Sequence, residues 1–123
     1  MQFTVISGTV DETLPPIYMW EIQGVSGEVR GRYVGKAKAG SKRPRTHYSR
    51  NVRNALAGKP YRLQAPAGFR RIHRALADAV REGLVIKLTF LANVPEGESI
   101  NEHERAWIRA QDCVGSAEWQ LND

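Results

Sequence analysis

Apolar residues follow two different rhythms along this chain of 123 residues, and the change of rhythm predicts the order of its elements. Segments rich in aromatic and β-branched residues, at 3–6, 17–22, 28–35 and 84–94, are typical of strands. A Gly/Ser-containing turn at 23–27 joins the second segment to the third. We therefore expect these two to pair as an antiparallel hairpin.

Helical spacing appears between and after these strands. A helix is predicted to begin at Pro44, which is tolerated in a first turn, and to end at Gly58. Ser99 and Glu102 have the spacing of a capping box and predict the start of a last helix. The clearest period predicts an amphipathic helix over 69–82, with apolar positions three or four residues apart: Phe69, Ile72, Leu76 and Val80.

This order of elements predicts an α+β fold, with a small, mainly antiparallel three-stranded sheet flanked by helices. The length is that of one domain over 1–123, which can bury a core without disulfide bonds. No apolar run is long enough to span a bilayer, and the first residues lack the features of a secretion signal. Since the lone Cys113 cannot form an internal disulfide, we expect a cytoplasmic protein without a membrane partner.

Positive charge is concentrated in the middle of the chain, although the net charge is only +5. Residues 29–81 contain fifteen of the eighteen Lys and Arg residues and one acid, Asp78. This distribution predicts salt-dependent binding of a polyanion, with a solvated basic surface as the alternative. The residues expected to contact nucleic acid are Lys38, Lys42, Arg45, Arg50, Arg53, Arg70, Arg71 and Arg74.

The hairpin and the segment after it contain the candidate chemistry. Tyr18 and Tyr33 lie on the two strands, and Arg43 and His47 are four residues apart, so the latter share a face if both are helical. Arginine can stabilise charge that develops on a phosphate, and histidine has a pKa near neutrality, which suits proton transfer. Each of these residues, like Lys36, also has an ordinary surface or half-buried interpretation.

Glu104, on the predicted last helix, is the candidate metal ligand. Mg²⁺ takes hard oxygen ligands, and one or two carboxylates suffice beside a phosphate. A solvated helix charge is the alternative for Glu104, and Glu102 is a rival carboxylate that capping already explains. His73 and His103 do not have metal-ligand spacing with Cys113, so a zinc site is not expected.

In order and spacing, these motifs resemble the GIY-YIG nuclease superfamily. Pro-Ile-Tyr at 16–18 resembles the GIY element, and Tyr-Val-Gly at 33–35 resembles YIG. Gly35 is followed after eight residues by Arg43 and after four more by His47. This is similar to the family's arginine and the His or Tyr that follows it.

The resemblance continues beyond the hairpin to the end of the chain. Lys36 is similar to a lysine found in part of the family, 104–108 to the helix with the metal-binding glutamate, and 121–122 to the segment with a late asparagine. The chain departs from the family in having Pro16 in place of the first glycine and a longer interval between the two motif tyrosines.

The resemblance implies a metal-dependent endonuclease that hydrolyses phosphodiester bonds of nucleic acid, DNA in particular, with Mg²⁺ or Mn²⁺ held by Glu104. A tyrosine would activate or position water, helped by His47 or Lys36, and Arg43 would stabilise the phosphate. A non-catalytic nucleic-acid-binding module and a protein-interaction domain are the alternatives. The catalytic residues that the resemblance implies are Tyr18, Tyr33, Lys36, Arg43, His47, Glu104 and Asn122.

Overall fold

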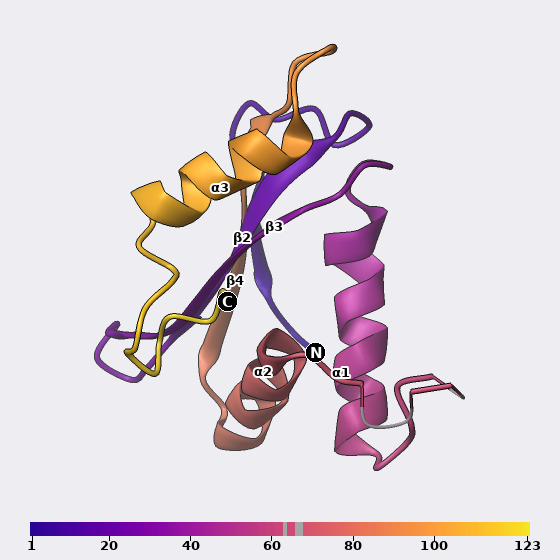
Figure 1. Ribbon diagram of the computed structural model, residues 1–123. Coiled ribbons are helices and arrows are strands. Elements are labelled where there is room, and N and C mark those ends of the chain that lie inside the picture. The colour runs from indigo at the N-terminus through magenta and orange to yellow at the C-terminus, as the bar shows by residue number, and fades with distance from the viewer. Residues whose placement is uncertain (63, 66–67) are drawn as a thin grey trace.

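The computed structural model of the protein describes residues 1–62, 64–65 and 68–123. The strands, in chain order, are β1 Thr4–Ile6, β2 Pro16–Gln23, β3 Val29–Lys36 and β4 Val85–Asn93. The helical segments are the π-helical turn η1 Arg43–His47 and the α-helices α1 Tyr48–Leu56, α2 Arg71–Glu82 and α3 Ile100–Ala110. Figure 1 shows how these helices flank the sheet.

The sheet has the strand order β1-β4-β2-β3. β2 pairs antiparallel with β3 and with β4, whereas β1 pairs parallel with β4. The α+β class and the hairpin are thus confirmed, but the three-stranded, mainly antiparallel sheet is wrong, since the sheet is four-stranded and mixed. The strand at 4–6 has only three residues, too few for their pattern to indicate which strand it pairs with. A parallel pairing also depends on how the long segment between the two strands folds.

β2 is the centre of the molecule because both of its faces are buried. Tyr18 and Trp20 join a cluster that includes residues of α1, α2 and β4. The alternate residues, Ile17 and Met19, join a second cluster, against which apolar residues of α3 pack. In Figure 1, α1 and α2 accordingly lie on one side of the sheet and α3 on the other.

Several of the residues that begin or end the helices were predicted from the sequence. Gly83 ends α2 in the left-handed conformation, at φ 69°. The Ser99 hydroxyl accepts the backbone N–H of Glu102 at 3.3 Å, so the predicted cap of α3 is confirmed. The helix predicted from Pro44 to Gly58 is present, but its first turn is η1, closed by a bond from the Tyr48 N–H to the Arg43 carbonyl.

Among the described residues, no helix has the length and apolar character needed to cross a membrane.

Candidate active site

The tyrosine of the Pro-Ile-Tyr segment packs directly on the glycine of the Tyr-Val-Gly segment. Tyr18 on β2 is paired with Gly35 on β3. A Cβ atom at position 35 would lie 2.6 Å from both Cζ and the hydroxyl oxygen of Tyr18. Position 35 therefore needs glycine, since any side chain would displace the Tyr18 ring.

A guanidinium group joins the tyrosine hydroxyls into one network. The hydroxyl oxygens of Tyr18 and Tyr48 are 2.9 Å apart, and both groups are buried. The Arg70 guanidinium donates to the Tyr48 hydroxyl and to the Tyr33 hydroxyl, each at 3.0 Å. We call Tyr18, Tyr33, Tyr48 and Arg70 the tyrosine network, which draws together β2, β3, α1 and the start of α2.

Tyr48 was missed by the sequence reasoning because the helix begins with a π turn. The Tyr48 N–H donates to the carbonyl of Arg43, five residues earlier. This turn therefore contains one more residue than an α-helical turn. The expectation that His47 shares a face with Arg43 assumed α-helical spacing, which closes a turn after four. A tyrosine beside His47 was the available signal, but nothing in the apolar period indicated the longer turn.

Lys36, Arg43 and His47 come together on a hollow of about 490 Å³ between the end of β3 and η1. Lys38 and Lys42 also line this β3–η1 hollow. Its lining contains no Asp or Glu among the described residues, so the charged side chains of the lining are all positive and favour an anion.

Glu104 on α3 is brought to this hollow by Lys36. The Lys36 ammonium donates to Glu104 Oε1 at 3.0 Å, and both side chains are partly exposed. These residues are sixty-eight positions apart, so the contact is made by the fold. Five of the seven predicted catalytic residues thus lie at the β3–η1 hollow or belong to the tyrosine network, and Glu104 adjoins them through Lys36.

Burial keeps the hydroxyls of Tyr18 and Tyr33 protonated at neutral pH. Desolvation, and then the neighbouring Tyr48, raise the pKa of Tyr18 and the pKa of Tyr33 well above their usual range. Arg43 opposes the change at Tyr18, and Arg70 opposes it at Tyr33, without offsetting it. The phenols are therefore suited to donate hydrogen bonds rather than to accept a proton.

His47 has the opposite property. Its partial burial, and then Arg50, Lys42 and Arg43, lower the pKa of the imidazole below its usual range. A histidine with a lowered pKa is neutral at pH 7 and can accept a proton. Of the groups at the β3–η1 hollow, His47 is therefore the better base.

The donors present fit Mg²⁺ only if a phosphate completes the site. Glu104 offers one carboxylate, and the described residues contain no group of three His, Cys, Asp or Glu side chains suited to hold a metal. Mg²⁺ is commonly held by one or two carboxylates with substrate phosphate and water. The Lys36 ammonium beside Glu104 Oε1 shows that the carboxylate already accepts a cation.

Asn122 neither lines the β3–η1 hollow nor belongs to the tyrosine network, and it holds the backbone of β3. Its Oδ1 accepts the Val34 N–H at 2.8 Å, and its Nδ2 donates to the Val34 carbonyl at 2.9 Å. Val34 stands between Tyr33 and Gly35, so this clamp fixes the strand that carries them. We therefore assign Asn122 a positioning role.

The predicted nucleic-acid-binding residues divide into four groups. Arg45 is paired through two bonds with Glu12, and this contact holds the pKa of that carboxyl at about 2, so little of its charge is available. Arg71 and Arg74 donate to the backbone carbonyls of Glu118 and Phe69. Arg70 belongs to the tyrosine network. The remaining residues of the predicted set are exposed: Lys38, Lys42, Arg50 and Arg53.

No protein-family model, curated protein sequence or solved structure matches the chain. The candidate site must therefore be judged on its own residues and their geometry, and the resemblance to the GIY-YIG superfamily stays a prediction.

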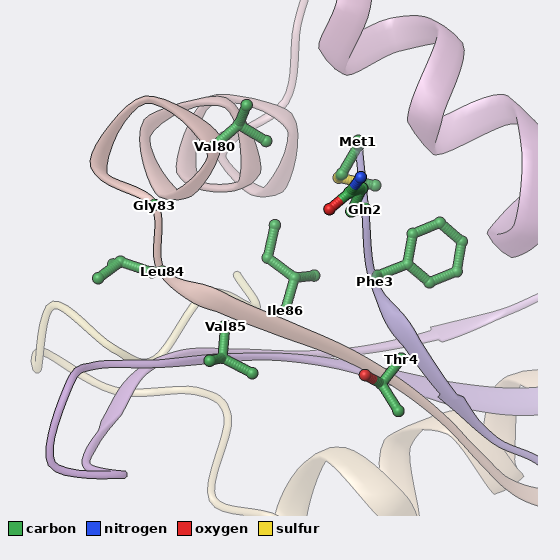
Figure 2. A pocket seen from close by; sticks show the side chains of 9 residues that line it. All are labelled: Met1, Gln2, Phe3, Thr4, Val80, Gly83, Leu84, Val85 and Ile86. Atoms are coloured by element: carbon green, nitrogen blue, oxygen red, sulfur yellow. The ribbon is translucent and has the colours of Figure 1, made fainter.

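A different pocket, of about 650 Å³, lies away from these residues, between the start of the chain, the end of α2 and the start of β4. Figure 2 shows its lining, which consists of apolar residues with Gln2, Thr4 and Gly83. None of the described residues that line it has a carboxyl, imidazole, thiol or amino group in its side chain. The chemistry of the protein is better sought at the β3–η1 hollow.

Proposed function

We propose that the protein is a metal-dependent endonuclease that hydrolyses phosphodiester bonds of nucleic acid, DNA in particular. The observation that carries the proposal is the contact between Lys36 and Glu104, at 3.0 Å, at a hollow that Arg43 and His47 also line. It combines a carboxylate, a base with a lowered pKa and permanent positive charge at one place. Each of these groups can assist hydrolysis of a phosphodiester, by holding a metal ion, by taking up a proton or by stabilising negative charge.

The side chains divide the work by their chemistry. Arg43 and Lys36 would hold the scissile phosphate and stabilise the charge that develops on it. Water attacking phosphorus would lose its proton to the His47 imidazole, while the bond to the departing sugar oxygen breaks and that oxygen takes up a proton. The Tyr33 hydroxyl, held by Arg70, would orient the reacting groups, and the buried Tyr18, paired with Tyr48, would support this arrangement from the core.

Glu104 would hold Mg²⁺, or Mn²⁺, against a phosphate oxygen. Such an ion, when bound, polarises the phosphoryl group and offsets its charge. The Lys36 ammonium would then share the carboxylate with the ion or turn to the phosphate. A cytoplasmic location, which the lone buried thiol of Cys113 favours, remains part of the proposal.

Glu104→Ala tests the proposal in a plasmid nicking assay with Mg²⁺ and with EDTA. The wild-type protein should nick supercoiled DNA only when the metal is present, and Glu104→Ala should abolish nicking while DNA binding is largely retained. Glu102→Ala is the matched control, because it removes the same charge from the same helix at an exposed position. A Glu104→Ala protein that nicks as fast as the wild type would remove Glu104 from the site. A wild-type protein that binds DNA without nicking it would be the non-catalytic module instead.

A further inference from the structure

A second basic hollow, of about 390 Å³, lies beside the candidate active site between α1 and α2. Its volume is within the range of roughly 300–1,000 Å³ that is typical of ligand pockets. Four arginines line it, and its described lining contains no Asp or Glu. We call it the arginine hollow, after Arg43 from η1, Arg50 from α1, Arg62 from the connection that follows, and Arg70 before α2.

The charges of the arginine hollow are not neutralised within the described residues. No ion pair joins any of its four arginines to a carboxylate there, whereas Arg32 and Arg45 each have a glutamate partner. Positive groups gathered around one hollow repel one another, and the repulsion is stronger where protein displaces water. An anion that enters the hollow relieves this repulsion, so the arrangement favours a negatively charged ligand.

Two imidazoles on the walls respond to this positive potential. Burial, and then nearby cations beginning with Arg50, lower the pKa of His47. Burial, and then Arg70, lower the pKa of His73 to about 4. Both rings are therefore neutral at pH 7. Because a neutral ring needs no carboxylate partner, neither histidine adds a negative group that would keep an anion out of the hollow.

His73 also sets the orientation of a neutral donor. Its Nδ1 accepts the Arg70 backbone N–H at 3.1 Å, so the proton of the neutral ring is on Nε2. Nε2 lies 3.4 Å from Asn51 Nδ2, and because two N–H groups cannot bond each other, we assign the Asn51 amide in the reversed orientation, with its oxygen accepting the Nε2 proton. The NH₂ group of Asn51 is then left as a donor at the hollow, which Asn51 lines.

The arginine hollow is continuous in sequence and charge with the site of proposed cleavage. Arg43 and His47 line both the β3–η1 hollow and the arginine hollow. Tyr48 and Arg70, which line the arginine hollow, belong to the tyrosine network. A ligand that spans the two hollows therefore carries at least two negative groups a short distance apart, as a nucleic-acid strand does.

We infer that the arginine hollow binds a phosphate of the substrate strand next to the phosphate that is cut. The inference rests on the proposed function, because it takes the ligand to be a nucleic acid. Arg50 and Arg62 are the side chains specific to this second phosphate, since Arg43 and Arg70 also belong to the machinery already described. The guanidinium groups offer paired donors that match phosphate oxygens.

The first test compares two double variants in binding to a short labelled DNA strand in EDTA. Arg50→Ala/Arg62→Ala should weaken binding by roughly tenfold for each arginine, and should lower the slope of log affinity against log salt by about 1. Arg105→Ala/Arg109→Ala is the matched control, because these exposed arginines line a hollow that also contains Asp112 and Asp123. An equal loss of affinity in the two double variants would overturn the inference.

The second test uses dinucleotides that differ by one phosphate, as competitors of the labelled strand. TpT has one phosphate, and pTpT and TpTp have a second at the 5′ or the 3′ end. The wild-type protein should prefer one of the latter two to TpT, and this preference should disappear in Arg50→Ala/Arg62→Ala but persist in the control. A wild-type protein without a preference, or a preference that survives in Arg50→Ala/Arg62→Ala, contradicts a second phosphate site.

Neither test requires cleavage, so the two proposals can fail separately. A wild-type protein that never nicks DNA but gives the expected dinucleotide preference keeps the arginine hollow and loses the nuclease. A protein that nicks DNA, and whose two double variants bind alike, keeps the nuclease and loses the arginine hollow. Because Arg50 and Arg62 are exposed, circular dichroism should show both double variants to be folded.

Discussion

The tyrosine network and the β3–η1 hollow are neighbours in the chain but are held in opposite ways. In the network, Tyr18 and Tyr48 are buried, and each hydroxyl has a partner at about hydrogen-bonding distance. In the hollow, Arg43 is exposed and His47 is half-buried, and the groups are brought together by the backbone at the end of β3 and in the turn of η1. One region is therefore part of the packed core, and the other is an open surface.

This difference separates the two demands on a site of this kind. The network supplies fixed geometry, and removing part of it should cost stability as well as activity. The hollow supplies charge to a ligand, and removing part of it should cost activity with little effect on stability. Three further substitutions test whether the two regions are separable in this way.

Arg43→Ala should have the largest effect, and almost all of it on cleavage. Loss of a donor that stabilises transition-state charge reduces the rate by roughly 10²–10³-fold. Because Arg43 is exposed, the free energy of unfolding should change by no more than about 0.5 kcal/mol. Nicking rates and urea unfolding measure the two effects, with Arg109→Ala as the control for loss of charge. If Arg43→Ala is strongly destabilised, the hollow is not separable from the core.

Gly35→Ala should show the converse, a loss of stability that accompanies the loss of activity. The added methyl would lie 2.6 Å from the Tyr18 ring, and such overpacking costs about 1–3 kcal/mol. Gly31→Ala on the same strand is the control, because its added methyl meets the ends of two aliphatic side chains, Leu121 at 2.9 Å and Ile22 at 3.1 Å, rather than an aromatic ring. Urea denaturation should show the larger loss for position 35, and equal losses would mean that the Tyr18 ring moves aside easily.

The smallest effect is a change of stability with pH that comes from His73, which accepts the backbone N–H of Arg70 beside the tyrosine network. The pKa of His73 is lowered to about 4, so its neutral form is favoured in the folded protein. This contribution is complete above the unfolded value of about 6.5 and is lost as the pH falls towards 4. His73→Gln keeps an acceptor for the Arg70 N–H but does not titrate there. The difference in unfolding free energy between the wild-type protein and His73→Gln should therefore shrink as the pH falls over this range. A difference that does not change with pH would mean that His73 is not held neutral.

The sequence predicted the parts of the fold that local pattern determines. The hairpin that carries Tyr18 and Tyr33, the helix over 69–82 and the Ser99 cap all follow from spacing, and all are present. The direction of the β1 pairing and the π turn before Tyr48 do not follow, because each depends on contacts with distant parts of the chain.

The candidate site was predictable to the same extent. The resemblance to the GIY-YIG motifs, through the spacing from Gly35, pointed to Arg43 and His47, and the structure places both on one hollow. Arg70 was expected to contact nucleic acid as one basic residue among many. Its place between the Tyr33 and Tyr48 hydroxyls depends on how the start of α2 packs against β3. The spacing of apolar residues within one segment does not predict such packing.

The parallel pairing of β1 also has a consequence for the order of assembly. Thr4 is paired with Lys87, so the strand that is synthesised first must wait for the one synthesised almost last. At a synthesis rate of about 5–20 residues per second, this wait lasts roughly 4 to 17 s on the ribosome. The β2–β3 hairpin needs only local contacts and can form first. The two motif tyrosines would then be side by side before the sheet has its outer edge.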